Sequence, residues 1–208
     1  MTEADRAPTE TMTATTKSTR ENLVQYFCLI TSYLFSVGGA PTDLGYLPLN
    51  NTTTVNANFT VSTYLAGGYI VQVSAPPPTD DVPSFHKLAT PSLPSTPVPG
   101  TEMFGMNLIA NSTNPSGGST PYGANPQCSP DSTFCPSGAL SASVTSNYNQ
   151  DGKYYYPSSS SNWTDTVVNS STSTGSVSYT LSFVYDISNA TPDGLYTYNG
   201  VFVATSTY

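Results

Sequence analysis

The stretch from Val177 to Ile187, VSYTLSFVYDI, constrains the fold more than any other part of the chain. Every second residue in it is large and apolar: Val177, Tyr179, Leu181, Phe183, Tyr185 and Ile187. Side chains alternate between the two faces of a β-strand, whereas six residues at this spacing cannot share one side of a helix. The pattern therefore predicts a strand with one face in a core, and we expect Tyr179, Leu181, Phe183 and Tyr185 to point into that core.

Two further alternating runs lie on either side of Gly67-Gly68. In VNANFTV, residues 55–61, the apolar positions are the odd-numbered ones, and asparagine and threonine fill the even-numbered ones. In YIVQVS, residues 69–74, Tyr69, Val71 and Val73 alternate with a more polar set. Two such runs joined near a Gly-Gly pair predict a β-hairpin.

The last residues, TPDGLYTYNGVFVATSTY, predict a turn followed by another strand. Pro192-Asp193-Gly194 supplies the turn. Tyr196 and Tyr198 then alternate, and after Asn199-Gly200 the apolar phase moves to Val201 and Val203. A one-residue change of phase is what a β-bulge produces, so we expect one long bulged strand that pairs with residues 176–187.

The remaining segments complete an all-β pattern. Residues 76–100 are rich in proline and predict a long extended connection, because proline cannot donate to a β-ladder. Residues 103–111 predict a strand, residues 112–140 a long loop, and SASVTS and KYYYP two weaker strands. Short strands with polar turns and no helical period predict an antiparallel β-sandwich, Ig-like or jelly-roll-like, over residues 33–208.

Residues 1–32 are expected to form a flexible arm and an apolar segment outside the sandwich. Residues 1–20 are rich in threonine and have no apolar period, which is typical of a disordered or processed arm. The apolar run at 23–37, LVQYFCLITSYLFSV, is open to three interpretations: a short helix or strand entering the fold, a signal-peptide core, or a membrane anchor. A membrane helix needs about 20 apolar residues, and this run is shorter. Membrane contact is expected only if 23–37 is an anchor.

Composition narrows the classes of function. Charged residues make up 9% of the 208 residues, against about 25% in an ordinary soluble domain. The formal net charge is −8 with only five lysines and arginines, and phosphate backbones require clustered basic residues. Nucleic-acid binding is therefore not expected. A surface wetted by hydroxyls and amides suits an extracellular or cell-surface location.

The three cysteines suggest one local disulfide. Cys128 and Cys135 flank the short loop CSPDSTFC, and Cys28 is separate. Such a pair in a Pro/Ser-rich loop is typical of a disulfide in an oxidising compartment, and the alternative is two free thiols. No zinc site is expected, because there is no second cysteine pair and the single histidine, His86, lies in a proline-rich stretch.

No catalytic constellation is recognisable, so no enzyme activity and no cofactor are expected. Asp80-Asp81 is an adjacent carboxylate pair, but neighbouring side chains of an extended segment point to opposite sides. A loop calcium site that uses one of them stays open. His86 has no G-x-S-x-G motif to accompany it and is interpreted as a surface loop histidine.

Aromatic and asparagine side chains are the candidate contacts with glycans. Trp163 and the triplet Tyr154, Tyr155 and Tyr156 are candidates for stacking on sugar rings, and the alternative is packing in the core. Seven N-x-S/T sequons permit glycosylation without indicating it, at Asn50, Asn51, Asn58, Asn111, Asn162, Asn169 and Asn189.

Five segments occur in an order that resembles a known family: FTVSTYLAGGYIVQVSAPP, GTEMFGMNLIAN, YGANPQ, PDSTF and TPDGLYTYNGVFVATSTY. Together they resemble an uncharacterised family of secreted surface proteins of candidate-phyla bacteria of the Saccharibacteria type, over roughly residues 33–208. The resemblance implies a location rather than a chemistry. In the family the PDSTF region is a plain strand, whereas here Cys128 and Cys135 flank it. The final segment alone is similar to the terminal strand of archaic chaperone–usher and spore-coat-like pilins.

Two hypotheses of function follow. The first is a non-enzymatic structural protein of the cell surface, filament- or layer-forming, and the alternative is a carbohydrate-binding adhesin module. The partners are then further copies of the chain or cell-surface glycans. Because the chain has little charge with which to protect its sheet edges, one hypothesis is that the arm of one subunit lies on an edge of the next, beside residues 195–207. The alternative is a disordered arm on a monomer.

Overall fold

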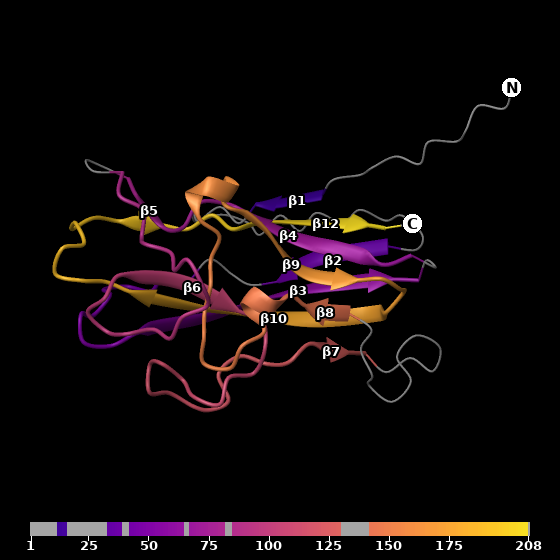
Figure 1. The fold of residues 1–208 in the computed structure, drawn as a ribbon, viewed down its shortest axis with the longest axis horizontal. Helices are drawn as coiled ribbons and strands as arrows, with labels where there is room; N and C mark the ends of the chain where they lie inside the picture. The colour runs from indigo at the N-terminus through magenta and orange to yellow at the C-terminus, as the bar shows by residue number, and fades with distance from the viewer. Residues whose placement is uncertain are drawn as a thin grey trace, which may run out of the picture.

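The structure is a computed structural model that describes residues 12–15, 33–38, 42–64, 67–81, 85–129 and 142–207. In these parts of the chain the regular structure is almost entirely antiparallel β, with two short 3₁₀ helices, η2 (Ser146–Tyr148) and η3 (Ser159–Ser161). Two larger sheets pack against each other, with β12 and β4 in the upper half of the view and β10 and β6 in the lower half (Figure 1). The all-β antiparallel sandwich predicted from the sequence is confirmed.

Within the described residues, each large sheet has five strands. Sheet A has the order β1 (Met12–Thr15), β12 (Val201–Ser206), β4 (Tyr69–Ser74), β9 (Thr164–Ser170) and β8 (Ala142–Val144). Sheet B has the order β2 (Tyr33–Gly38), β3 (Thr53–Thr63), β10 (Gly175–Asp186) and β6 (Met103–Asn107), and β7 (Gln127–Cys128) also pairs with β10. A third, two-stranded sheet joins β5 (Thr79–Asp80) to β11 (Tyr196–Thr197).

Strand β10 is the centre of sheet B, as the alternating pattern predicts. It pairs with β3 along one side and with β6 and β7 along the other. The four predicted core residues, Tyr179, Leu181, Phe183 and Tyr185, are all buried, and β3 presents Phe59 and Val61 to the same core.

The second half of β10 is buried on both faces, which the sequence pattern does not predict. Ser182, Val184 and Asp186 are also inaccessible to solvent. Loop residues cover them: Tyr122 and Tyr154 form a small cluster with Val184, and the Tyr122 hydroxyl donates a 2.7 Å hydrogen bond to the Phe183 carbonyl. The outer face of sheet B therefore has a second apolar layer made of loops.

The predicted hairpin across Gly67-Gly68 is wrong. The two alternating runs do form β3 and β4, but β3 belongs to sheet B and β4 to sheet A. The connection crosses from one sheet to the other, and the Tyr69 hydroxyl meets the Tyr179 hydroxyl of β10 at 2.6 Å across the core. Both faces of the sandwich need apolar strands, so alternation alone does not determine which runs pair with each other.

The predicted pairing and phase of the final strand are also wrong. β12 pairs with β4 and β1 of sheet A rather than with β10. Its buried residues are Phe202 and Ala204, whereas Val201 and Val203 are half-buried. The chain therefore keeps one phase through Asn199-Gly200, where it passes from the small sheet into sheet A. The bulge of sheet A lies elsewhere, between Val71 and Gln72 of β4 opposite β9.

Stacked aromatic rings fill the core between the sheets. Phe59 of β3 stacks on Tyr179 of β10 at 4.8 Å between ring centroids, and Phe202 of sheet A lies 5.9 Å from Phe59. Further along β10, Phe104 packs 5.9 Å from Phe183 and 5.0 Å from Tyr198. Large aromatic side chains such as these bury much apolar area and favour stacked and tilted contacts.

The apolar run at 23–37 is only partly within the described residues. Its end forms the beginning of β2, an edge strand of sheet B whose Phe35 is 1% exposed, in agreement with a strand entering the fold. Residues 23–32 lie outside the described residues. Of the residues that the structure does describe, none belongs to a helix with the length and apolar character needed to cross a membrane.

The weaker predicted segments form only short strands or isolated bridges in the described residues. Within SASVTS, Ala142–Val144 form β8, and KYYYP forms isolated bridges rather than a strand, between Tyr154 and Ser95 and between Tyr155 and Met106. The described residues of the proline-rich connection contribute the two-residue strand β5 and isolated bridges at Lys87 and Ser95.

The buried carboxylate of Asp186 makes stability depend on pH. Burial raises the pKa of Asp186, a shift that the Thr52 hydroxyl and the Val98 amide partly offset, and neither carboxylate oxygen has a hydrogen bond of good geometry within the described residues. Because the folded state favours the protonated carboxyl, its pKa lies above the unfolded value of about 3.9. The contribution of the protonated carboxyl to stability is complete below pH ~4 and is lost as the pH rises through the folded pKa.

We therefore expect Asp186 to contribute more to the free energy of unfolding at pH 4 than at pH 7. Melting curves of the wild type and of Asp186→Asn over this range measure the effect. The difference in melting temperature between the two proteins should change between pH 4 and pH 7, because only the wild type has a titrating group at this position. A constant difference would contradict the assignment.

Candidate functional site

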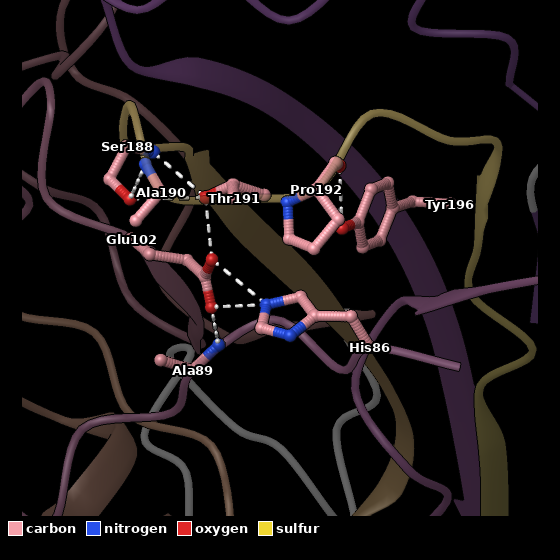
Figure 2. A network of polar contacts seen from close by, with 8 residues as sticks. All are labelled: His86, Ala89, Glu102, Ser188, Ala190, Thr191, Pro192 and Tyr196. Carbon is pink, nitrogen blue, oxygen red and sulfur yellow. Dashed lines mark hydrogen bonds and ion pairs between the residues drawn. The ribbon is translucent and has the colours of Figure 1, made fainter. Parts of the chain in front are cut away.

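Glu102 is the centre of a network of polar contacts among the described residues, shown in Figure 2. It directly precedes β6, and His86 lies at the other end of the proline-rich connection, just after β5. The imidazole Nε2 of His86 lies 3.0 Å from both oxygens of the Glu102 carboxylate. The same carboxylate accepts a 2.8 Å hydrogen bond from the Ala89 amide.

A third contact ties this network to the connection between β10 and β11. The Thr191 hydroxyl donates to Glu102 at 2.5 Å and accepts a 2.9 Å hydrogen bond from the Ser188 amide (Figure 2). The His86 ring meets the Tyr196 ring edge-on, with centroids 6.2 Å apart. One carboxylate therefore joins the segment that holds His86 and Ala89, the start of β6, and the connection that holds Thr191.

The geometry of this network suits a brace better than a catalytic triad. A triad places the imidazole between the nucleophile and the carboxylate. Here the Thr191 hydroxyl is bonded to Glu102 directly, so these three side chains are in a different order. The side chain of Glu102 is only 14% exposed, which gives its charge-assisted hydrogen bonds more weight than surface contacts have.

Several carboxylates lie near Tyr196 and affect its pKa. Burial raises the pKa of Tyr196, and the nearby charges of Asp80, Glu102 and Asp193 raise it further. Asp80 is buried and Asp81 is exposed, as expected for neighbours in an extended segment. In the parts of the chain described here, no group of three or more His, Cys, Asp and Glu side chains is arranged to hold a metal ion.

A hollow of about 230 Å³ lies next to Glu102. Most of its lining comes from the proline-rich connection, including Pro91 and Val98, and Met103 lines it from β6. The carboxylate of Glu102 is already bonded within the protein, and the other polar side chains of the lining are the hydroxyls of Thr90, Ser95, Thr96 and Thr101. Binding sites for small molecules combine an apolar lining with a few polar groups placed to fix the ligand.

The structure separates the predicted glycan-stacking residues. Tyr154 and Tyr156 are fully buried, and Tyr156 donates a 2.8 Å hydrogen bond to the Ala75 carbonyl. Tyr155 is half-buried against Tyr148. The ring faces of Tyr154 and Tyr156 are therefore not available to a sugar, and the stacking prediction applies to Trp163, which is half-buried in a loop on the side of sheet A.

The sequons fall into two groups. Six of the asparagines are exposed: Asn50, Asn51, Asn58, Asn162, Asn169 and Asn189. Asn111 is 0% exposed, and its amide donates to the carbonyls of Ile109 (3.0 Å) and Tyr122 (3.1 Å) while its oxygen accepts from the Gly152 amide at 2.9 Å.

We expect Asn111 to stay unmodified when the folded protein is exposed to a glycosylating enzyme, because its amide is buried and fully bonded. Asn111→Ala should lower the free energy of unfolding by about 2 kcal/mol, because it leaves buried backbone groups unpaired. Asn189→Ala, at an exposed sequon, is the matched control. Glycopeptide mapping and thermal melting check both results, and a glycan at Asn111 of folded protein would contradict this burial.

The disulfide between Cys128 and Cys135 stays a prediction, because Cys135 lies outside the described residues. Cys128 is half-buried on β7. A closed loop this short is expected to contribute about 2–3 kcal/mol. Non-reducing peptide mapping should find the two cysteines joined and Cys28 bonded to neither, and recovery of Cys128 and Cys135 alkylated without prior reduction would refute the pairing.

The Glu102 network was not predicted from the sequence, because no local sequence motif indicates it. His86 lies 16 residues from Glu102 and Thr191 lies 89 residues away, so no short motif joins them. The fold and the network together define an all-β antiparallel sandwich braced at one end by the half-buried carboxylate of Glu102. No family model, no curated protein and no solved structure matches this chain.

Proposed function

We propose that this protein is a non-enzymatic structural protein of the extracellular cell surface. The observation that supports the proposal is the use of its carboxylates as braces between segments. Glu102 joins three segments, and Asp151 accepts from the amide (2.7 Å) and hydroxyl (2.6 Å) of Ser112. Asp165 accepts from the Tyr148 hydroxyl at 3.0 Å. Groups that carry chemistry in enzymes here hold loops onto a rigid sandwich.

The surface composition supports the extracellular part of the proposal. Only 9% of the chain is charged, and serine, threonine and asparagine provide much of its polar surface. Hydroxyl and amide groups keep a surface hydrated without the net charges that attract nucleic acid or anionic membranes. The resemblance to secreted surface proteins agrees with this location, and filaments or layers of the chain are the form in which we expect it to act.

Protease treatment of intact producing cells tests the proposal. The protein should be degraded while a cytoplasmic marker in the same cells stays whole, and negative-stain images of the released native material should show ordered filaments or sheets. Protection of the protein until the cells are lysed would overturn the proposed location.

A second candidate function, carbohydrate binding, is favoured by the backbone of Trp163. Asn162 and Trp163 both have left-handed backbone angles, with φ of 53° and 58°. This region is unfavourable for a large aromatic residue and is often found where a side chain is held for binding. A glycan array with the wild type, Trp163→Ala and the control Tyr46→Ala separates the two functions. An adhesin should lose binding in Trp163→Ala alone, and no binding by the wild type would exclude this function for the glycans on the array.

A further inference from the structure

Strand β1 is the outermost strand of sheet A and covers an edge of β12. It pairs antiparallel with β12 in the register Met12↔Ala204, Thr13↔Val203, Ala14↔Phe202 and Thr15↔Val201. On its other side β12 pairs with β4. In Figure 1, β1 lies beside β12 along the upper edge of the sandwich. Without a strand in this place, residues 201–204 would present unpaired main-chain groups to solvent.

The register of this pair fits the sequence of both strands. Phe202 and Ala204 are buried, and they stand opposite Ala14 and Met12. The half-buried Val201 and Val203 stand opposite threonines. A slip of one residue would place threonines opposite the buried positions, so the alternation of MTAT disfavours such a slip.

The connection of β1 to the rest of the chain permits a different partner. Residues 16–32, which are 17 residues, separate β1 from β2, and β2 belongs to sheet B. Seventeen residues span at most about 60 Å when extended. Every copy of the chain has the same β12 edge, so a β1 from a second copy makes the same main-chain hydrogen bonds as its own.

We propose that β1 is exchanged between copies, so that Met12–Thr15 of one copy pairs with Val201–Ala204 of the next. The strand and the edge that receives it are different surfaces, so the contact is head-to-tail. Such a contact gives a ring where the rotation between copies closes and an open chain of subunits where it does not. Neither MTAT nor VFVATS contains a charged residue that would repel a second copy. The exchange makes a second copy of the chain the partner in the proposed structural function, and it rests on that function. The exchange itself is measured on purified protein.

Cysteine pairs at register positions test the exchange, in a Cys28→Ser background. Opposite residues of an antiparallel pair have Cα atoms about 4.5–5.5 Å apart, which suits a disulfide. Thr13→Cys and Val203→Cys are made as separate single variants, mixed and oxidised. Exchange should give disulfide-linked heterodimers several-fold above a control mixture of Thr13→Cys with Ser178→Cys, whose second cysteine is exposed on sheet B.

A second pair, Thr15→Cys with Val201→Cys, repeats the test should one variant fold poorly, and peptide mapping identifies the bond. Heterodimers above control from either pair support exchange. Two results overturn it: double variants that close only within single chains while the mixtures stay at the control level, or no bond in any combination. Failure of the protease test on cells concerns location alone and leaves these results unaffected.

Discussion

Replacing Phe59 with alanine should lower the free energy of unfolding by about 3–5 kcal/mol. Phe59 is 1% exposed, and its ring contacts both sheets: it stacks on Tyr179 of sheet B and lies 5.9 Å from Phe202 of sheet A. Its removal leaves a cavity between two layers whose main chains are held by hydrogen bonds and cannot close around it. The loss combines transfer free energy with the cost of that cavity.

Thermal or denaturant melting measures this effect, and a drop in melting temperature of ~10 °C is expected for a chain of this size. Tyr46→Ala is the matched control, because Tyr46 is an aromatic side chain that is 85% exposed. The control should melt within ~2 °C of the wild type. Equal melting temperatures for the Phe59 variant and the wild type would show that the core is not arranged as described.

Replacing Gly68 with alanine should cost about 3 kcal/mol or prevent folding. A Cβ atom at this position would lie 1.7 Å from the carbonyl oxygen of Ser170 and 2.4 Å from its carbonyl carbon. Both atoms belong to the backbone at the end of β9, so no side chain can rotate to make room. The connection that crosses from sheet B to sheet A must pass β9 at this distance, and only glycine permits it.

Gly38→Ala is the control for this substitution. Gly38 also lies at the end of a strand, but a Cβ there would meet its nearest atom, the Asn58 carbonyl oxygen, at an ordinary 3.8 Å. The Gly38 variant should be as stable as the wild type or slightly more stable, because glycine is costly in a strand. Comparable losses in both variants would mean that the close approach to β9 does not explain the requirement for Gly68.

The sequence predicts what each strand buries better than which strands pair. The faces of β3, β4 and β10 follow from alternation, because burial of one face selects for apolar residues at every second position. The pairing of β10 with the final strand was wrong because two strands on opposite sides of one core have the same pattern. The phase of β12 was wrong because the two valines were given more weight than Phe202, whose larger ring fills the core.

The candidate site was harder to predict than the fold. His86 and Glu102 are unremarkable in sequence, and their contact exists only because β5 and β6 bring the two ends of a proline-rich connection together. Tyr154 and Tyr156 were candidates for binding because a run of three tyrosines resembles an exposed platform. Tyr154 is buried in the small cluster on the outer face of sheet B, and Tyr156 is buried in the main core, and no local sequence pattern reports either packing.

The pairing of β1 with β12 has a consequence for the order of folding. It joins residues 12–15 to residues 201–204, so sheet A is completed only when segments about 190 residues apart have met. Contacts of such long sequence separation form slowly, because the entropy of closing the loop is lost before the contact is gained. Synthesis begins at the N-terminus, so residues 12–15 are made long before residues 201–204. Throughout synthesis, β1 therefore has no β12 of its own chain to pair with. During that time, the β12 edge of a neighbouring copy that was finished earlier is available to β1 before its own β12 has been made.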